Sequence, residues 1–245
     1  MKKKLIIVGL IVLFILALDQ FIKVWVKLSF TVYDPSVDLI GSWFRLLYIE
    51  NQGMAFGTTF GGGSWAKLAL SVFRIFAIGG IAYYWFKQAK LKVKLEFLIA
   101  IGFIFAGAFG NLIDSMFYDF IFSDMYDPCL SFNQLEGTGI YTECPLGVLE
   151  TRQTGFLYGN VVDMFQFNVF WPSWVPWLGG SEVFPAIWNV ADASISVGVI
   201  MVLIRQRVYF PKKKMDLGVE KVEVQENTIV DSKDIINESD QEINQ

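Results

Sequence analysis

Charged and amide side chains interrupt several long apolar stretches of this 245-residue sequence. They recur at helical spacing: one pair lies four residues apart and two pairs lie three apart, so the members of each pair would share a helix face. The residues are Asp19, Lys23, Asn111, Asp114, Asn189 and Asp192. A charged group inside a membrane costs on the order of 2.5 to 3.5 kcal/mol. We expect these groups either to join helices through internal hydrogen bonds or to take part in chemistry.

Asp163 and Asp192 are the candidates for direct catalysis. Neither has a basic residue within four positions, so a local ion pair does not explain them. Asp163 lies among apolar neighbours in GNVVDMF, residues 159–165. Two carboxyl groups that share one proton supply a general base for water and an acid for the scissile carbonyl. This pair predicts an aspartyl protease site.

Composition removes several alternatives. The sequence has no histidine, which excludes Ser/His/Asp and Cys/His nucleophilic sites and the HExxH zinc motif. Cys129 and Cys144 are too few for a structural zinc site, so we expect no metal and no other cofactor. A pI near 5.0 gives no indication of a nucleic-acid partner.

Four apolar stretches are long enough to cross a bilayer core, which takes about 20 helical residues. They cover residues 5–28, 65–86, 95–117 and 184–204. The expected fold class is therefore membrane α-helical. A cleaved signal peptide at the N-terminus is the alternative for the first stretch, but no A-x-A cleavage site follows and the apolar face continues to Trp25.

Basic residues predict the orientation of these spans, because they favour the cytoplasmic side. They cluster before residue 5, between 87 and 94, and after 204, whereas 119–183 holds one basic residue, Arg152, against eight acidic ones. Both termini are therefore predicted to be cytoplasmic, with exported segments at 29–64 and 119–183. The polar groups of the spans then lie near the outer face of the membrane.

The exported segments predict further structure. Runs rich in aromatic and β-branched residues at 43–51 and 155–170 indicate strands of a small sheet on the outer membrane surface. WPSWVPW at 171–177 has the composition of an interfacial segment. An oxidising compartment favours a disulfide between Cys129 and Cys144. Residues 215–245 are acidic, contain no aromatic residue and are predicted to form a disordered cytoplasmic tail, which leaves 1–214 as the membrane domain.

Five separated motifs resemble those of lipoprotein signal peptidase, also called signal peptidase II, a bacterial inner-membrane aspartyl protease family. The resemblance covers residues 5–207. The motifs are DQFIK at 19–23, ENQGMAFG at 50–57, GAFGNLID at 107–114, GNVVDMF at 159–165 and WNVADASI at 188–195.

This resemblance implies removal of the signal peptide from diacylglyceryl-modified prolipoproteins, with cleavage before the lipidated cysteine. Asp163 and Asp192 correspond to the catalytic pair. Other family positions shape the site or bind substrate: Asp19, Lys23, Asn51, Gly53, Asn111, Asp114 and Asn189. The implied fold is four transmembrane helices with a small exported β-cradle and a short interfacial helix, and the implied partners are prolipoproteins and membrane lipids.

Some features depart from this pattern or leave alternatives open. Ser115 stands where many members of the family have arginine, and the stretch 119–155 is longer than expected. A transporter or channel subunit with a carboxylate-lined cation path is the alternative from another functional class. A Ser/Lys peptidase using Ser71 and Lys67 fits poorly, because both lie in the second span. Lys67 and Arg74 either snorkel or pair with a carboxylate.

Overall fold

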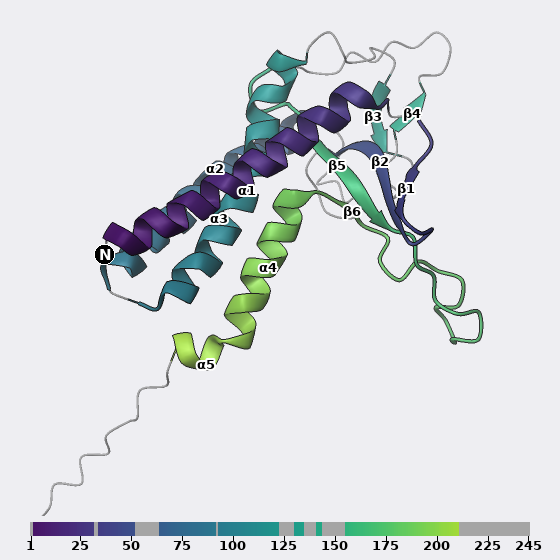
Figure 1. Ribbon diagram of the computed structural model, residues 1–245. Helices are drawn as coiled ribbons and strands as arrows, with labels where there is room; N and C mark the ends of the chain where they lie inside the picture. The colour runs from purple at the N-terminus through teal and green to yellow at the C-terminus, as the bar shows by residue number, and fades with distance from the viewer. Residues whose placement is uncertain are drawn as a thin grey trace, which may run out of the picture. The chain divides into compact units, whose positions relative to one another are not determined.

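The computed structural model describes residues 2–31, 34–51, 64–91, 93–122, 130–134, 141–143 and 155–210. Residues up to Phe210 belong to one compact unit. Its helices are α1 (Lys2–Ser29), α2 (Ser64–Lys90), α3 (Leu95–Ile121), α4 (Val190–Ile204) and the short α5 (Gln206–Tyr209) (Figure 1). Several predictions fall outside the described residues: Gly53, the Cys129 and Cys144 pair, Arg152, and the tail 215–245.

The predicted spans agree with the helices except at the fourth. α1, α2 and α3 are each long and apolar enough to cross a membrane, and α4 is a shorter apolar helix of 15 residues. The prediction that the fourth helix starts at 184 is wrong, because helix α4 begins at Val190. The side chain of Asn189 accepts a hydrogen bond from the backbone N–H of Asp192, which caps the helix at this point.

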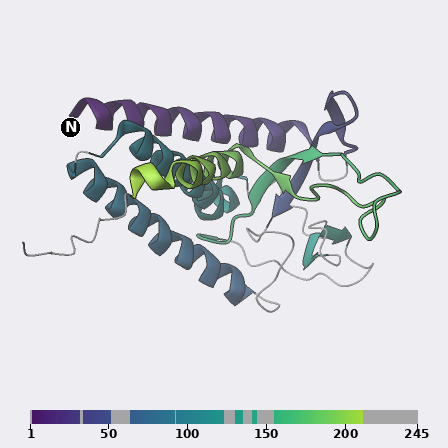
Figure 2. The ribbon, with the colours of Figure 1, turned by 90° about the horizontal axis from the view of Figure 1, so that it is seen from below.

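α3 lies at the centre of the helices and contacts α1, α2 and α4. Figure 2 shows α3 and α4 between α1 and α2. Two glycines allow α3 and α4 to approach closely: a Cβ on Gly107 would lie 2.1 Å from the carbonyl oxygen of Ala191, and one on Gly198 would lie 2.6 Å from that of Ala100. These close approaches let the backbones of α3 and α4 pack directly against each other.

Apolar side chains also cover the outside of the helices. Phe14, Phe21, Phe73 and Phe76 are all more than 60% exposed. An apolar exterior of this kind suits a lipid environment, where exposed hydrocarbon carries no penalty.

A four-stranded antiparallel sheet adjoins the ends of α1 and α3, with strand order β1-β2-β5-β6. The strands are β1 (Val37–Ile40), β2 (Phe44–Asn51), β5 (Val161–Phe167) and β6 (Ile187–Trp188). β2 and β5 confirm the strands predicted at 43–51 and within 155–170, although 155–160 forms turns. In their register Ile49 is opposite Asp163. β3 (Leu130–Gln134) and β4 (Tyr141–Glu143) form a separate pair.

Turns, not a helix, occupy the tryptophan-rich stretch between β5 and α4. The backbone N–H of Val175 donates to Pro172 and that of Gly179 donates to Val175. Trp174 and Trp177 are highly exposed at 79% and 102%. Within residues 155–210 the one short helix is α5, which follows α4 and was not predicted.

Candidate active site

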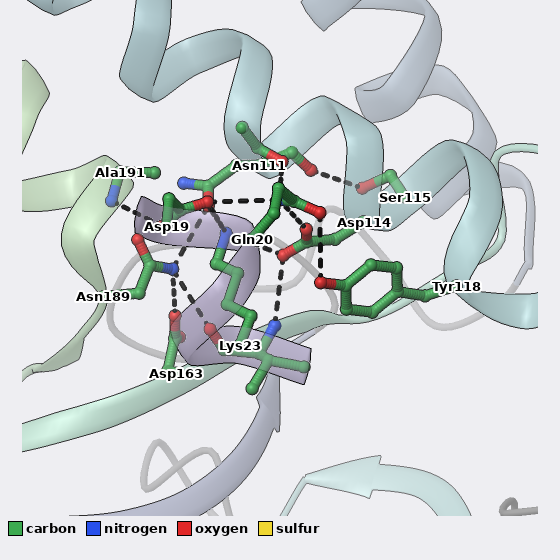
Figure 3. Close-up of polar contacts among 12 residues, drawn as sticks. Asp19, Gln20, Lys23, Asn111, Asp114, Ser115, Tyr118, Asp163, Asn189 and Ala191 are labelled. Carbon is green, nitrogen blue, oxygen red and sulfur yellow. Dashed lines mark hydrogen bonds and ion pairs between the residues drawn. The ribbon is translucent and has the colours of Figure 1, made fainter. Parts of the chain in front are cut away.

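A fully buried lysine joins two helices at the outer end of the predicted spans. The Nζ atom of Lys23 on α1 lies 2.9 Å from Asp19 Oδ2 and 2.8 Å from Asp114 Oδ2 on α3. It also donates a 2.8 Å hydrogen bond to Asn111 Oδ1 (Figure 3). The predicted pairing of Asp19 with Lys23 is confirmed, and the same lysine satisfies two α3 residues at once.

The two carboxylates around Lys23 are fixed by further donors. Asp19 Oδ1 accepts a 2.8 Å hydrogen bond from the backbone N–H of Ala191, which ties α1 to the first turn of α4. Gln20 donates to Asp114 Oδ1 at 2.9 Å and accepts from the hydroxyl of Tyr118 at 3.1 Å. Sequence analysis missed Gln20 and Tyr118, although Gln20 lies inside the first motif beside Asp19.

A chain of amides links Asp163 to Asp192. Asn189 Nδ2 donates to Asp163 Oδ1 at 2.7 Å and to Asn111 Oδ1 at 3.1 Å. Asn111 Nδ2 then donates to Asp192 Oδ1 at 2.8 Å. On the other side, Asn51 Nδ2 donates to Asp163 Oδ2 at 3.0 Å. The two candidate aspartates, from β5 and α4, are therefore parts of one hydrogen-bonded network.

The two aspartates have different surroundings. Asp163 is only 3% exposed. Burial first, and the nearby charge of Asp192 second, raise the pKa of Asp163 to about 8. Asp192 is partly exposed and lies in the first turn of α4, where its carboxylate accepts from the backbone N–H of Asn189. The positive end of a helix dipole favours an ionised carboxylate at such a position.

All but one of the predicted site residues therefore gather in one place. Asp19, Lys23, Asn51, Asn111, Asp114 and Asn189 contact each other or one of the two aspartates. Gly53 is the exception, because it lies outside the described residues. The prediction that Asn189 and Asp192 share a helix face needs correction, because Asn189 is the cap of α4 and not part of the helix.

A second buried polar cluster, which sequence analysis did not find, lies beside the first. It consists of Lys27, Tyr48, Glu50, Asn160 and Lys67. Lys27 pairs with Glu50, and Asn160 donates to the second oxygen of that carboxylate at 3.0 Å. Burial alone would raise the pKa of Glu50, but the charge of Lys27 and hydrogen bonds outweigh it and the pKa is lowered. The sequence offered one indication of this cluster, because Glu50 directly precedes Asn51 in the second motif.

The structure also shows the contacts of Lys67, Ser71 and Arg74 on α2, whose roles the sequence left open. Lys67 donates to Asn160, and Ser71 donates to the carbonyl oxygen of Leu157 at 2.9 Å. These contacts tie α2 to the chain before β5 and do not form a Ser/Lys dyad. Arg74 donates to Ser115 Oγ at 3.3 Å. Across the described residues, no group of three or more His, Cys, Asp or Glu side chains is arranged to hold a metal ion.

Known proteins are similar to this chain in sequence and in fold. The family model described as "Signal peptidase (SPase) II" matches residues 11–208. A lipoprotein signal peptidase of Porphyromonas gingivalis is 38% identical over 204 residues, which is 81% of each chain. That of Amoebophilus asiaticus is 31% identical and covers 80% of this chain and 76% of its own.

A solved bacterial membrane enzyme, determined by the in meso method at 1.9 Å resolution, has the same fold. It superimposes with a TM-score of 0.51 and covers 81% of this chain and 91% of its own at 24% identity. The match with the family model spans the helices and the sheet that carry the network around Asp163 and Asp192. This multi-pass bacterial membrane chain therefore belongs to the signal peptidase II family of aspartic peptidases.

Proposed function

We propose that Asp163 and Asp192 are the catalytic pair with which this chain removes signal peptides from diacylglyceryl-modified prolipoproteins, cutting before the lipidated cysteine. The family supplies the activity and the prolipoprotein substrates. The observation that carries the assignment of the pair is the amide chain that joins the two carboxylates through Asn189 and Asn111. It holds them in one network while leaving their surroundings unequal.

The unequal surroundings suggest a division of roles. Asp192 is partly exposed and near the N-terminus of α4, so its carboxylate suits the general base that removes a proton from water. Asp163, with a pKa raised to about 8, keeps its proton at neutral pH and can donate it to the oxygen of the scissile carbonyl. Attack of the water gives a tetrahedral intermediate. Its collapse breaks the C–N bond: one hydroxyl of the intermediate returns a proton to Asp163, and the amine leaves with the proton that Asp192 took from water.

The remaining residues position this pair. Lys23 neutralises Asp19 and Asp114, and this ion cluster fixes α1 against α3. Asn51 and Asn189 donate to the two oxygens of Asp163 and so restrict its orientation. By resemblance, Gly53 shapes the substrate site as well.

The membrane placement is part of the proposal. The basic residues at the N-terminus, in the α2 to α3 connection and after α4 favour cytoplasmic termini and an exported sheet. Four transmembrane helices, with a short interfacial helix beside the exported β-cradle, are what the family resemblance implies. The site then lies near the outer face of the bacterial inner membrane. There the lipid chains of the substrate can stay among membrane lipids while its peptide bond reaches water. Residues 1–214 form the protease domain in this scheme, and 215–245 is a disordered tail.

Cleavage by the purified protein tests the assignment. A diacylated prolipoprotein, followed by gel shift, should be cut by the wild type and not by Asp163→Asn or Asp192→Asn at matched levels of folded protein. Asp38→Asn is the matched control, because Asp38 is an exposed aspartate that pairs with Arg45 on the outer edge of the sheet, away from the network around Asp163. A cation path through Asp19 and Asp114 is disfavoured, because Lys23 already occupies both carboxylates.

A further inference from the structure

Arg74 is a charged residue in the middle of α2, a helix whose exposed face carries apolar side chains. It lies ten residues after Ser64, the start of α2, which is about 15 Å along the helix axis. Phe73 and Phe76 beside it are strongly exposed, as lipid-facing side chains are, whereas Arg74 is partly buried. An arginine at this depth is costly and calls for a specific partner inside the protein.

The contacts of Arg74 lead toward the catalytic pair. Its Nη1 atom donates to Ser115 Oγ at 3.3 Å, and Ser115 donates in turn to the carbonyl oxygen of Asn111 at 3.2 Å. The side chain of Asn111 donates to Asp192. The guanidinium therefore lies against the stretch of α3 that carries Asn111 and Asp114. Its favourable charge interactions are with three carboxylates, Asp192, Asp114 and Asp163, in decreasing order.

Lys23 does not make a second cation redundant. An ammonium group has three donors, and those of Lys23 face Asp19, Asp114 and Asn111. Its direct ion pairs are with two carboxylates outside the catalytic pair, so its charge acts on Asp163 and Asp192 only from a distance and is shared among four carboxylates. Arg74 approaches from a different helix, and its first charge partner is Asp192.

We infer that Arg74 is a positioning residue of the active site: presented from α2 and oriented by Ser115, it holds Asp192 in the ionised form that the general base requires. This inference rests on the proposed roles of Asp163 and Asp192. An opposite charge nearby favours the ionised carboxylate, so loss of the guanidinium should make the pair harder to ionise. Arg74 is not required to touch the substrate, and KM should not depend on it.

The pH profile of cleavage separates this role from a purely structural one. The charged groups that face the pair are Asp19 and Lys23 from α1, Arg74 from α2 and Asp114 from α3. Of these, Arg74 can be changed without breaking the ion cluster around Lys23. The experiment measures kcat and KM against pH on a diacylated prolipoprotein for wild type, Arg74→Lys and Arg74→Gln. Arg45→Gln, an arginine on β2 that pairs with Asp38, is the control.

In Arg74→Gln the acid limb of kcat/KM should move up by about one pH unit, so that the rate on that limb falls about tenfold with KM unchanged. Arg74→Lys should keep the limb near its wild-type position, and Arg45→Gln should match wild type throughout. A wild-type acid limb in folded Arg74→Gln would overturn the inference. An equal shift in Arg74→Lys and Arg74→Gln would also overturn it, because the charge would then not be the cause.

A second variant covers the case in which Arg74→Gln is unstable. If Arg74→Gln does not fold, Ser115→Ala decides, because it leaves the charge in place and removes the contact that orients it. An upward shift of the acid limb in Ser115→Ala supports the inference, and an unchanged profile contradicts it. The role of Arg74 and the catalytic role of the aspartates can be rejected independently of each other. Inactive Asp163→Asn and Asp192→Asn with a wild-type profile in Arg74→Gln would reject Arg74 alone.

Discussion

Asn189 donates a 2.7 Å hydrogen bond from its side-chain amide to Asp163 Oδ1. The same residue caps α4, because its side-chain oxygen accepts from the backbone N–H of Asp192 at 2.9 Å. One asparagine thus fixes both where α4 begins and how β5 meets that helix. Asp163 and Asp192 are 29 positions apart in the sequence, yet this one side chain contacts both of them.

Removing that side chain should damage activity more than stability. Asn189→Ala deletes a helix cap, which costs about 1 kcal/mol, and also removes the donor to Asp163. We expect a fall in kcat of at least about 100-fold, because a misplacement near 1 Å is enough for such a loss. Asn168→Ala is the control, since the partly exposed Asn168 side chain donates to the backbone carbonyl of Ser42. Cleavage rates and unfolding temperatures at matched protein levels give both quantities, and near-normal cleavage by Asn189→Ala would contradict this role.

Gly107 should tolerate no side chain. A Cβ at this position would lie 2.1 Å from the carbonyl oxygen of Ala191, so Gly107→Ala must push α4 away from α3. Overpacking of this kind costs about 1 to 3 kcal/mol, and here it also moves Asp192. Gly79→Ala is the matched control on α2, because no atom lies within 4 Å of its added Cβ. Thermal unfolding in detergent should show a lower midpoint for Gly107→Ala alone, and equal midpoints for the two variants would refute the close-contact argument.

Glu50 should matter for folding because it is the buried ion-pair partner of Lys27. Glu50→Gln removes the negative charge opposite the buried Lys27, and breaking a buried ion pair typically costs about 3 to 5 kcal/mol. Lys27→Met combined with Glu50→Gln should recover part of this loss. The folded pKa of Glu50 is lowered, so its stabilising effect is present above its usual pKa and is lost as pH falls through the folded value. Unfolding midpoints from pH 7 down to pH 3 test this, and a single variant as stable as wild type would argue against a buried ion pair.

The raised pKa of Asp163 predicts a pH-dependent effect of the opposite sign. Between the unfolded pKa, near 3.8, and the folded value of about 8, the folded protein binds a proton that the unfolded chain has lost. Wild-type stability should therefore fall as pH rises across this window. Asp163→Asn cannot ionise, so its unfolding midpoint should exceed that of wild type by an amount that grows from pH 5 to pH 8 and then levels off. A difference independent of pH would show that Asp163 has an ordinary pKa.

Several elements could be predicted because their signals are local. The length and apolar content of α1, α2 and α3 are properties of single stretches, and the pairing of Asp19 with Lys23 follows from their spacing of four residues. β2 and the core of β5 were recognisable from their composition. The start of α4 was misplaced, because hydropathy continues through 184–189 while the cap at Asn189 sets the true boundary.

The missed features depend on contacts between distant residues. Lys27 meets Glu50 across 23 positions, and Arg74 meets Ser115 across 41. β1 and β6 have four and two residues, too short to give a period-two pattern. The contact with Arg74 also bears on Ser115, which stands at a position where arginine was expected: a cation does lie there, but α2 supplies it.

The central claim is that Asp163 and Asp192 act as one unit. The most direct test measures the rate of prolipoprotein cleavage for wild type, Asp163→Asn, Asp192→Asn and the double variant at matched levels of folded protein. Because both carboxyl groups are needed for the same step, each single variant should lose nearly all activity and the double variant should be hardly slower. Substantial turnover by either single variant, or losses that multiply in the double variant, would contradict a catalytic pair.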